Sequence, residues 1–182
     1  MEPIREDEEE YSWRELKLPP SPSVPESGSE SERLTGGRRN GRDVLIAVDH
    51  GPSSKLAFDW ALANFCRPYD TIHLVHAVSS LQNQIVYDMS KGLIEKLAVE
   101  ALEVAMVSCV ARIVQGDAGK VICKEAKKIR PAAVIMGSRG RGLVRSVLQG
   151  SVGEHCFHHC KAAPIVIVPR NDMTEESSVD LS

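Results

Sequence analysis

The chain has 182 residues, of which 42% are hydrophobic and 4% aromatic, and it carries a net charge of −3. That length fits one domain with tails, and no apolar run approaches the roughly 20 residues of a membrane helix, so we expect no membrane partner. The charge is uneven, at −3 for residues 1–42, +4 for residues 43–170 and −4 for residues 171–182, and a mildly basic, aromatic-poor middle suits a small anionic ligand rather than nucleic acid.

Residues 1–42 are rich in Glu, Ser, Pro and Gly, which predicts a disordered N-terminal tail, and the acidic residues 171–182 predict a second one. Four apolar residues form either a short docking motif or, as we favour, a chance cluster: Tyr11, Trp13, Leu16 and Leu18. Ser21 precedes Pro22 and is a candidate site for a kinase. The acidic beginning is unlike an export signal, so we expect a cytoplasmic location, with the nucleus as an alternative.

The folded part is expected at residues 43–170, where apolar runs alternate with helical patterns. The runs predict strands at 44–48, 71–78, 109–114, 132–136 and 165–168. Spacing and capping residues predict helices from Ser53 or Ser54 to Cys66, from about Met89 to Met106, from Gly119 to Ile129 and from about Ser151 to Cys160. Strict alternation of strand and helix predicts a single three-layer α/β/α domain of the α/β class. Its five-stranded parallel sheet would have the strand order 3-2-1-4-5.

The fourth predicted strand runs into a segment that mixes glycine with arginine: Gly137, Arg139, Gly140, Arg141 and Gly142. Glycine lets a backbone approach a phosphate closely, and the helix that follows presents free N–H groups and positive potential. In open parallel sheets the ligand lies beyond the carboxyl ends of the strands, where the strand order reverses. That point falls between the fourth strand and the first, which ends at Asp49. Both patterns therefore predict a nucleotide site here.

The spacing of these glycines is also that of a known motif. Gly137 and Gly140 are followed after nine residues by Gly150-Ser151, which matches G-x2-G-x9-G-[ST]. Further marks are VLIAVD at 44–49, LVHAV at 74–78 and APIVIVP at 163–169. Over about residues 43–170 the chain resembles the universal stress protein family, with the plant-type, ATP-binding members closest. The resemblance implies an adenine nucleotide alpha hydrolase-like fold, a role in stress response, and ATP or AMP as ligand, with Mg²⁺ able to enter with the nucleotide.

The resemblance also implies the residues of the site. Adenine and ribose would lie near the ends of the first two strands, at Ala47, Val48, Asp49 and Ala77. Ribose and phosphates would lie at the end of the fourth strand and on the glycine segment, at Met136, Gly137, Arg139 and Gly140. The phosphates would reach Gly150, Ser151 and Val152. A carboxylate accepting from adenine or ribose, and backbone N–H groups around a phosphate, are chemically suited to these roles.

One residue departs from the family pattern. Gly153 stands where the family usually has Ser or Thr, so a hydroxyl contact to the phosphates is lost. Arg139, Arg141 and Arg145 could compensate, with Arg141 or Arg145 reaching a terminal phosphate as a guanidinium fork. A monophosphate could then bind as well as ATP.

Other chemistry-bearing residues are interpreted as structural. His155, Cys156, His158, His159 and Cys160 would point in several directions from one predicted helix, and zinc sites usually draw a second ligand pair from elsewhere, so we expect no metal and two core cysteines. His76 is expected to be either a hydrogen-bonded structural residue or a residue at the edge of the site, rather than a catalytic base. No nucleophile and base are placed together, so we expect no catalytic residues and at most slow ATP hydrolysis.

The last predicted strand suggests a second kind of function. Its apolar residues, Ile165, Val166, Ile167 and Val168, are expected at a sheet edge, where pairing with a second copy would cover them. The resemblance implies such homodimers. The leading hypothesis is therefore a nucleotide-dependent switch or signalling module. The alternative is a dimeric interaction module that binds no nucleotide and is regulated by phosphorylation of the N-terminal tail.

Overall fold

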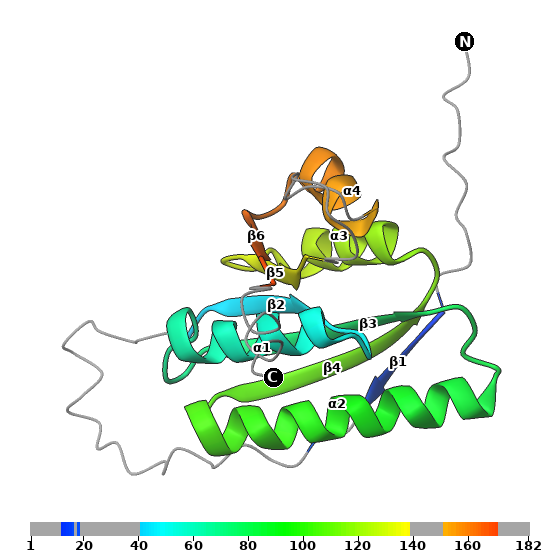
Figure 1. Ribbon diagram of the computed structural model, residues 1–182, viewed down its shortest axis with the longest axis horizontal. Coiled ribbons are helices and arrows are strands. Elements are labelled where there is room, and N and C mark those ends of the chain that lie inside the picture. Colours follow the sequence, from blue (N-terminus) through cyan, green and yellow to red (C-terminus); the bar gives the residue numbers. More distant parts are fainter. Residues whose placement is uncertain (1–11, 17, 19–40, 139–150, 171–182) are drawn as a thin grey trace, which may run out of the picture.

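The computed structural model describes residues 12–16, 18, 41–138 and 151–170, and these form one mixed sheet between two layers of helices (Figure 1). The strands are β1 (Trp13–Leu16), β2 (Asp43–Ala47), β3 (Thr71–Val78), β4 (Ser108–Gln115), β5 (Val134–Gly137) and β6 (Ile165–Val168). The helices are α1 (Pro52–Asn64), α2 (Gln84–Ala105), α3 (Ala118–Ile129) and α4 (Ser151–His159). Among the described residues the sheet order is β1-β4-β3-β2-β5-β6.

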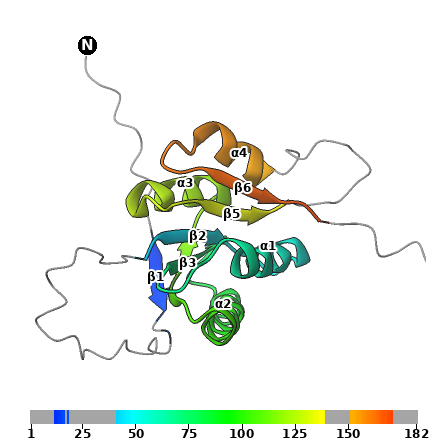
Figure 2. The same cartoon turned by 90° about the vertical axis from the view of Figure 1, so that its left-hand side faces the viewer.

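The five parallel strands confirm the predicted order. When β2 is counted as the first of them, β4-β3-β2-β5-β6 is the order 3-2-1-4-5. The central strand β2 alternates between the two faces, because Val44 and Ile46 lie in one hydrophobic cluster and Leu45 lies in the other. The cluster with Val44 also contains apolar residues of α1 and α2, whereas the cluster with Leu45 contains those of α3 and α4. Figure 2 shows these helix pairs on opposite faces of the sheet.

Two of the described helices, α2 and α3, begin at a residue whose side chain caps them. Asp117 caps α3, and its carboxylate accepts the N–H of Lys120 at 3.0 Å, as its position before the helical pattern predicts. The predicted start of α2 at Met89 is wrong, because α2 begins at Gln84. The side chain of Asn83 accepts the N–H groups of Ile85 and Val86, at 3.1 and 3.3 Å, and thereby extends the helix into a stretch with little apolar periodicity.

The predicted disordered tail needs one correction. Trp13–Leu16 forms β1, which pairs antiparallel with β4, so that Trp13 lies opposite Val114 and Leu16 opposite Ala111. The cluster that we favoured as a coincidence thus contains a strand. Trp13 and Leu16 are three positions apart, so the segment lacks the apolar alternation that predicts a half-buried strand. The outer edge of β4 presents unpaired N–H and C=O groups that an extended segment can bind.

Candidate functional site

The chain segments that follow β2 and β5 leave the carboxyl ends of these strands on opposite faces of the sheet. The strands are neighbours, with Ile46 paired to Ile135, and β2 leads into α1 on one face. The helix that follows β5 along the chain, α4, lies on the other face (Figure 2). Such a divergence leaves an opening beyond the strand ends, which is where open α/β sheets bind ligands.

Asp49 sits at this point in a tight turn. Its backbone N–H donates to Ser54 Oγ at 2.9 Å, and its Oδ1 accepts the N–H of Gly51 at 2.7 Å. The prediction that Ser53 or Ser54 caps α1 is wrong, because Gly51 is the N-cap and Pro52 follows it in the first turn. The turn therefore holds the half-buried carboxylate of Asp49 at the end of β2, between the strand and the helix.

His76 braces the same strand end from β3. Its ring is buried, and its Nδ1 lies 2.7 Å from the carbonyl oxygen of Val48, so Nδ1–H donates to that oxygen. The exposed ring of His50 packs edge-on against it at 5.5 Å between centroids. Burial lowers the pKa of His76 below its usual 6.5 and so favours the neutral ring. The predicted role of His76 as a hydrogen-bonded structural residue agrees with these contacts.

Gly137 has a packing role that the sequence did not reveal. A Cβ at this position would lie 2.1 Å from the carbonyl oxygen of Ser53 and 3.0 Å from the backbone nitrogen of Ser54. The start of α1 therefore packs directly on the backbone at the end of β5. This contact sets the separation between α1 and the carboxyl end of β5, so glycine is required here whether or not a phosphate binds.

The other predicted site residues that the structure describes lie near the carboxyl ends of the same strands or in the first turn of α4. Ala47 and Ala77 are half-buried on the α3/α4 face near the ends of β2 and β3, and Met136 is buried beside Gly137. Val152 lies in the first turn of α4 and packs against the same cluster as Met136. Ser151 begins α4. The other predicted residues lie outside the described residues: Arg139, Gly140, Arg141, Arg145 and Gly150.

The cysteines and histidines of α4 occupy separate environments. Cys156 and Cys160 are buried in the core as predicted, and burial raises the pKa of the Cys156 thiol. His158 and His159 are exposed, and His159 stacks on His155 at 4.3 Å between centroids. In the described ranges no group of three or more His, Cys, Asp or Glu side chains could hold a metal ion. None of the described helices combines the length and apolarity that crossing a membrane requires.

The three-layer architecture and the order of the five parallel strands, whose connections leave on opposite faces after β2 and β5, define an α/β protein with the nucleotide alpha hydrolase-like fold. Residues 41–169 match the model of the universal stress protein family, and the chain therefore belongs to that family.

Individual relatives agree with this assignment. The chain is 39% identical over 75 residues to a universal stress protein A-like protein of Arabidopsis thaliana, in an alignment that covers 41% of this chain and 42% of the relative. A universal stress protein family protein from Arabidopsis thaliana, solved with AMP bound, has a TM-score of 0.56 and 28% identity, covering 75% of this chain and 97% of that one. The hypothetical protein MJ0577 shares the fold, with a TM-score of 0.62, 21% identity, and coverage of 73% and 99%.

Proposed function

We propose that this protein binds an adenine nucleotide, AMP or ATP, at the carboxyl ends of β2 and β5, where the connections that follow the two strands leave on opposite faces of the sheet. We also propose that nucleotide occupancy controls the role of the protein in a stress response. The observation that carries the proposal is that the pairing of β2 with β3 and β5 brings the carboxyl ends of these three strands together, with Ala77 on β3, Gly137 on β5 and Asp49 just after β2. The first turn of α4 lies beside the same end of β5, because a Cβ on Gly153 would contact Met136. The Arabidopsis relative that holds AMP supports the choice of ligand. A cytoplasmic location, or a nuclear one, belongs to the same proposal.

Each residue has a chemical task in this proposal. The Asp49 carboxylate accepts a hydrogen bond from a ribose hydroxyl or the adenine amino group, while the small side chain of Ala77 leaves room for the base. The backbone N–H groups of Ser151 and Val152 at the start of α4 donate to a phosphate, and Gly150, outside the described residues, is assigned to the same phosphate. Gly140 permits close backbone approach, and Arg139 and Arg141 neutralise phosphate charge. The phosphate oxygens of ATP would hold a Mg²⁺ ion that accompanies the nucleotide.

Calorimetric titration with ATP and with AMP tests the proposal. Asp49→Asn retains an oxygen for the N–H of Gly51 but loses the negative charge, so we expect it to keep the turn and weaken nucleotide binding by about tenfold. Glu103→Gln removes an exposed charge from the last turn of α2, which lies near the amino ends of the parallel strands, and should leave the affinity for nucleotide unchanged. Absence of binding heat for the wild-type protein with either nucleotide would contradict the proposal.

The alternative is a dimeric interaction module without nucleotide. It is favoured by β6, which lies at the sheet edge with Ile165, Val166 and Ile167 half-exposed. Phosphorylation at Ser21, outside the described residues, would regulate this module. The ratio of absorbance at 260 and 280 nm of the purified protein separates the two functions, because co-purified nucleotide raises it.

A further inference from the structure

The outer edge of β4 carries a strand from outside the family domain. β1 pairs antiparallel with β4, whereas the other described strands of the sheet pair in parallel. The family match begins at residue 41, so β1 lies outside the part of the chain that defines the fold. Extended segments that bind an open sheet edge take affinity from backbone hydrogen bonds and specificity from alternate side chains. β1 has the form of such a bound segment.

The ladder and four side chains hold β1 in place, and one of them is Arg14, whose guanidinium lies 4.7 Å from the centre of the Tyr87 ring on α2. The carbonyl of Ser12 accepts the N–H of Gln115 at 3.0 Å. Leu16 is only 8% exposed and joins the core between the sheet and α2. On the other face, the guanidinium of Arg112 lies 5.1 Å from the Trp13 ring, and its Nη2 lies 3.5 Å from Glu15 Oε2. The bound pattern is thus an aromatic residue, an acid two positions later, and then leucine.

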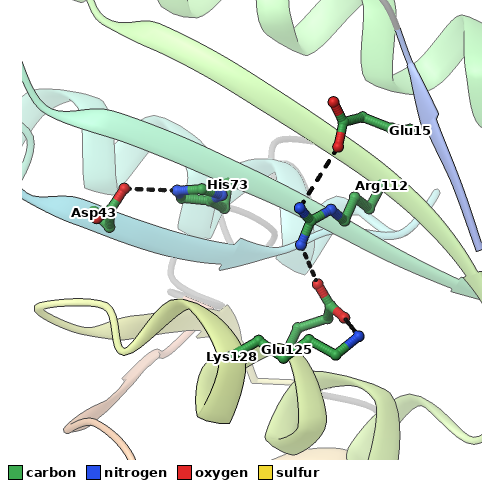
Figure 3. Close-up of polar contacts among 6 residues, drawn as sticks. All are labelled: Glu15, Asp43, His73, Arg112, Glu125 and Lys128. Atoms are coloured by element: carbon green, nitrogen blue, oxygen red, sulfur yellow. Dashed lines mark hydrogen bonds and ion pairs between the residues drawn. The ribbon is translucent and has the colours of Figure 1, made fainter.

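The receiving surface is built by the family domain itself. Glu125 of α3 is fully buried, and its Oε2 accepts from Arg112 Nη1 at 2.8 Å. Lys128 Nζ donates to its other oxygen at 3.0 Å. Figure 3 shows Arg112 reaching Glu125 on one side and Glu15 on the other. Because Glu125 holds the guanidinium, Arg112 is already positioned for a carboxylate before any strand arrives.

The resident strand uses this surface incompletely. The Glu15–Arg112 separation of 3.5 Å exceeds the 2.7–2.9 Å or so of a charge-assisted hydrogen bond. Arg112 Nε is buried and has no hydrogen-bond partner within the described part of the chain. Trp13 remains 45% exposed. A segment whose carboxylate reached both Nε and Nη2 of Arg112 would fit this edge better than β1 does.

We propose that the outer edge of β4 is a strand-docking site, which Trp13–Leu16 occupies in cis and which an extended segment of a partner protein occupies by exchange. The partner segment pairs antiparallel with Ala111–Val114 and carries an aromatic residue, a carboxylate two positions on, and leucine next. Residues 17–42 tether β1 to the domain, and the resulting high effective concentration makes the tail the default occupant. The complementary charge of Arg112 and the leucine site under α2 select the partner.

The probe for this site is a dye-labelled peptide of the chain's own residues 12–18, SWRELKL, followed by fluorescence anisotropy on the full-length protein. Trp13→Ala/Leu16→Ala removes two anchors of the resident strand and vacates the edge. We expect the peptide to bind this variant at least about tenfold more tightly than wild type, because the tethered competitor is gone. Arg14→Pro, which interrupts the ladder of β1 and leaves both anchors, vacates the edge by a second route.

Specificity is tested on the vacated protein. Changing Glu15 of the peptide to Gln should weaken binding several-fold, and Arg112→Gln in the protein should abolish the difference between the two peptides. Circular dichroism confirms that each variant is folded. The proposal is overturned if the peptide fails to bind both vacated variants while they are folded. It is equally overturned if a peptide with Ala at positions 13 and 16 binds as well as the original.

Discussion

At the scale of single residues, Gly153 is the position where this chain departs from the pattern that its family resemblance implies. It lies in the first turn of α4, where helix N–H groups are available to an anion. A Cβ here would lie 3.4 Å from Ile167 Cδ1 and 3.9 Å from Met136 Sδ, which are ordinary contact distances. The surrounding structure therefore accepts a side chain, and nothing in its packing demands glycine.

Two substitutions at Gly153 separate packing from chemistry. Gly153→Ala and Gly153→Ser should each raise the free energy of unfolding, by up to about 1 kcal/mol, because glycine is a poor helix residue. Only Gly153→Ser supplies a hydroxyl, so it alone should tighten ATP binding, by about tenfold. Urea denaturation measures the stability and calorimetric titration the affinity. Equal affinity of the Ser and Ala variants would show that the hydroxyl has no part in binding.

His76 makes stability depend on pH in a defined window. Its folded-state pKa is lowered by burial, so between that value and 6.5 the unfolded chain binds a proton that the folded protein excludes. The contribution of His76 is fully present above pH 6.5 and is lost as the pH falls below it. Each unit by which the pKa is lowered is worth about 1.4 kcal/mol.

The measurement is the free energy of unfolding of wild type and His76→Gln between pH 7.5 and 5. Glutamine can still donate to the carbonyl of Val48 but does not titrate, so the variant should lose less stability over this interval. Parallel pH profiles for the two proteins would contradict the assignment.

At the scale of elements, the contact between α1 and β5 determines the shape of the proposed nucleotide site. The backbone of Ser53 and Ser54 lies on Gly137 with no space for a side chain. Gly137→Ala should therefore push α1 away from β5 and lower the free energy of unfolding by about 1–3 kcal/mol. Nucleotide binding should weaken as well, because Asp49 precedes α1 and would move with it.

Gly92 provides the matched control. It lies inside α2, and a Cβ there would meet no atom within 4 Å. Gly92→Ala should raise the free energy of unfolding by about 0.5–1 kcal/mol, since alanine is the better helix former. Urea denaturation of both variants compares the same chemical change at a crowded and an open position. A Gly137→Ala protein as stable as wild type would contradict the close contact.

At the scale of the whole molecule, β6 offers an edge for a second copy. Val134 and Ser138 of the neighbouring chain segment donate to the carbonyls of Pro164 and Val168. Backbone groups alternate in direction along a parallel strand, so the N–H and C=O of Ile165 and Ile167 face away from β5. These outward groups are the ones that a β6–β6 dimer would pair.

Ile167→Pro removes one outward N–H and should shift the proposed dimer toward monomer, with a dissociation constant raised about tenfold or more. Ile167→Ala loses the same side-chain contacts but keeps the N–H, and should remain dimeric under the same conditions. Sedimentation velocity distinguishes the species, and thermal melts check that both variants are folded. Dimerisation of the proline variant at wild-type strength would place the interface elsewhere.

The sequence by itself determined the five parallel strands and the residues at their carboxyl ends, whereas the predicted strand order followed from the topology that alternating α/β folds adopt. Each of these strands is a short apolar run with a helical pattern beside it, and this information is local. Asp117 likewise predicts the start of α3 within a few residues, because it caps the helix. The start of α2 was harder to predict, because Gln84 and Ile85 are exposed and the first buried position of the helix is Ser90, a polar residue.

Only the tertiary structure decided the roles of Trp13–Leu16 and Gly137. The segment Trp13–Leu16 becomes β1 because β4, far along the chain, offers an open edge and a positioned Arg112. The glycine that resembles part of a phosphate loop also admits the backbone of Ser53. Both facts depend on groups brought together by folding across long sequence separations. Local composition and spacing carry no record of such contacts, whereas they do record which face of each strand is buried.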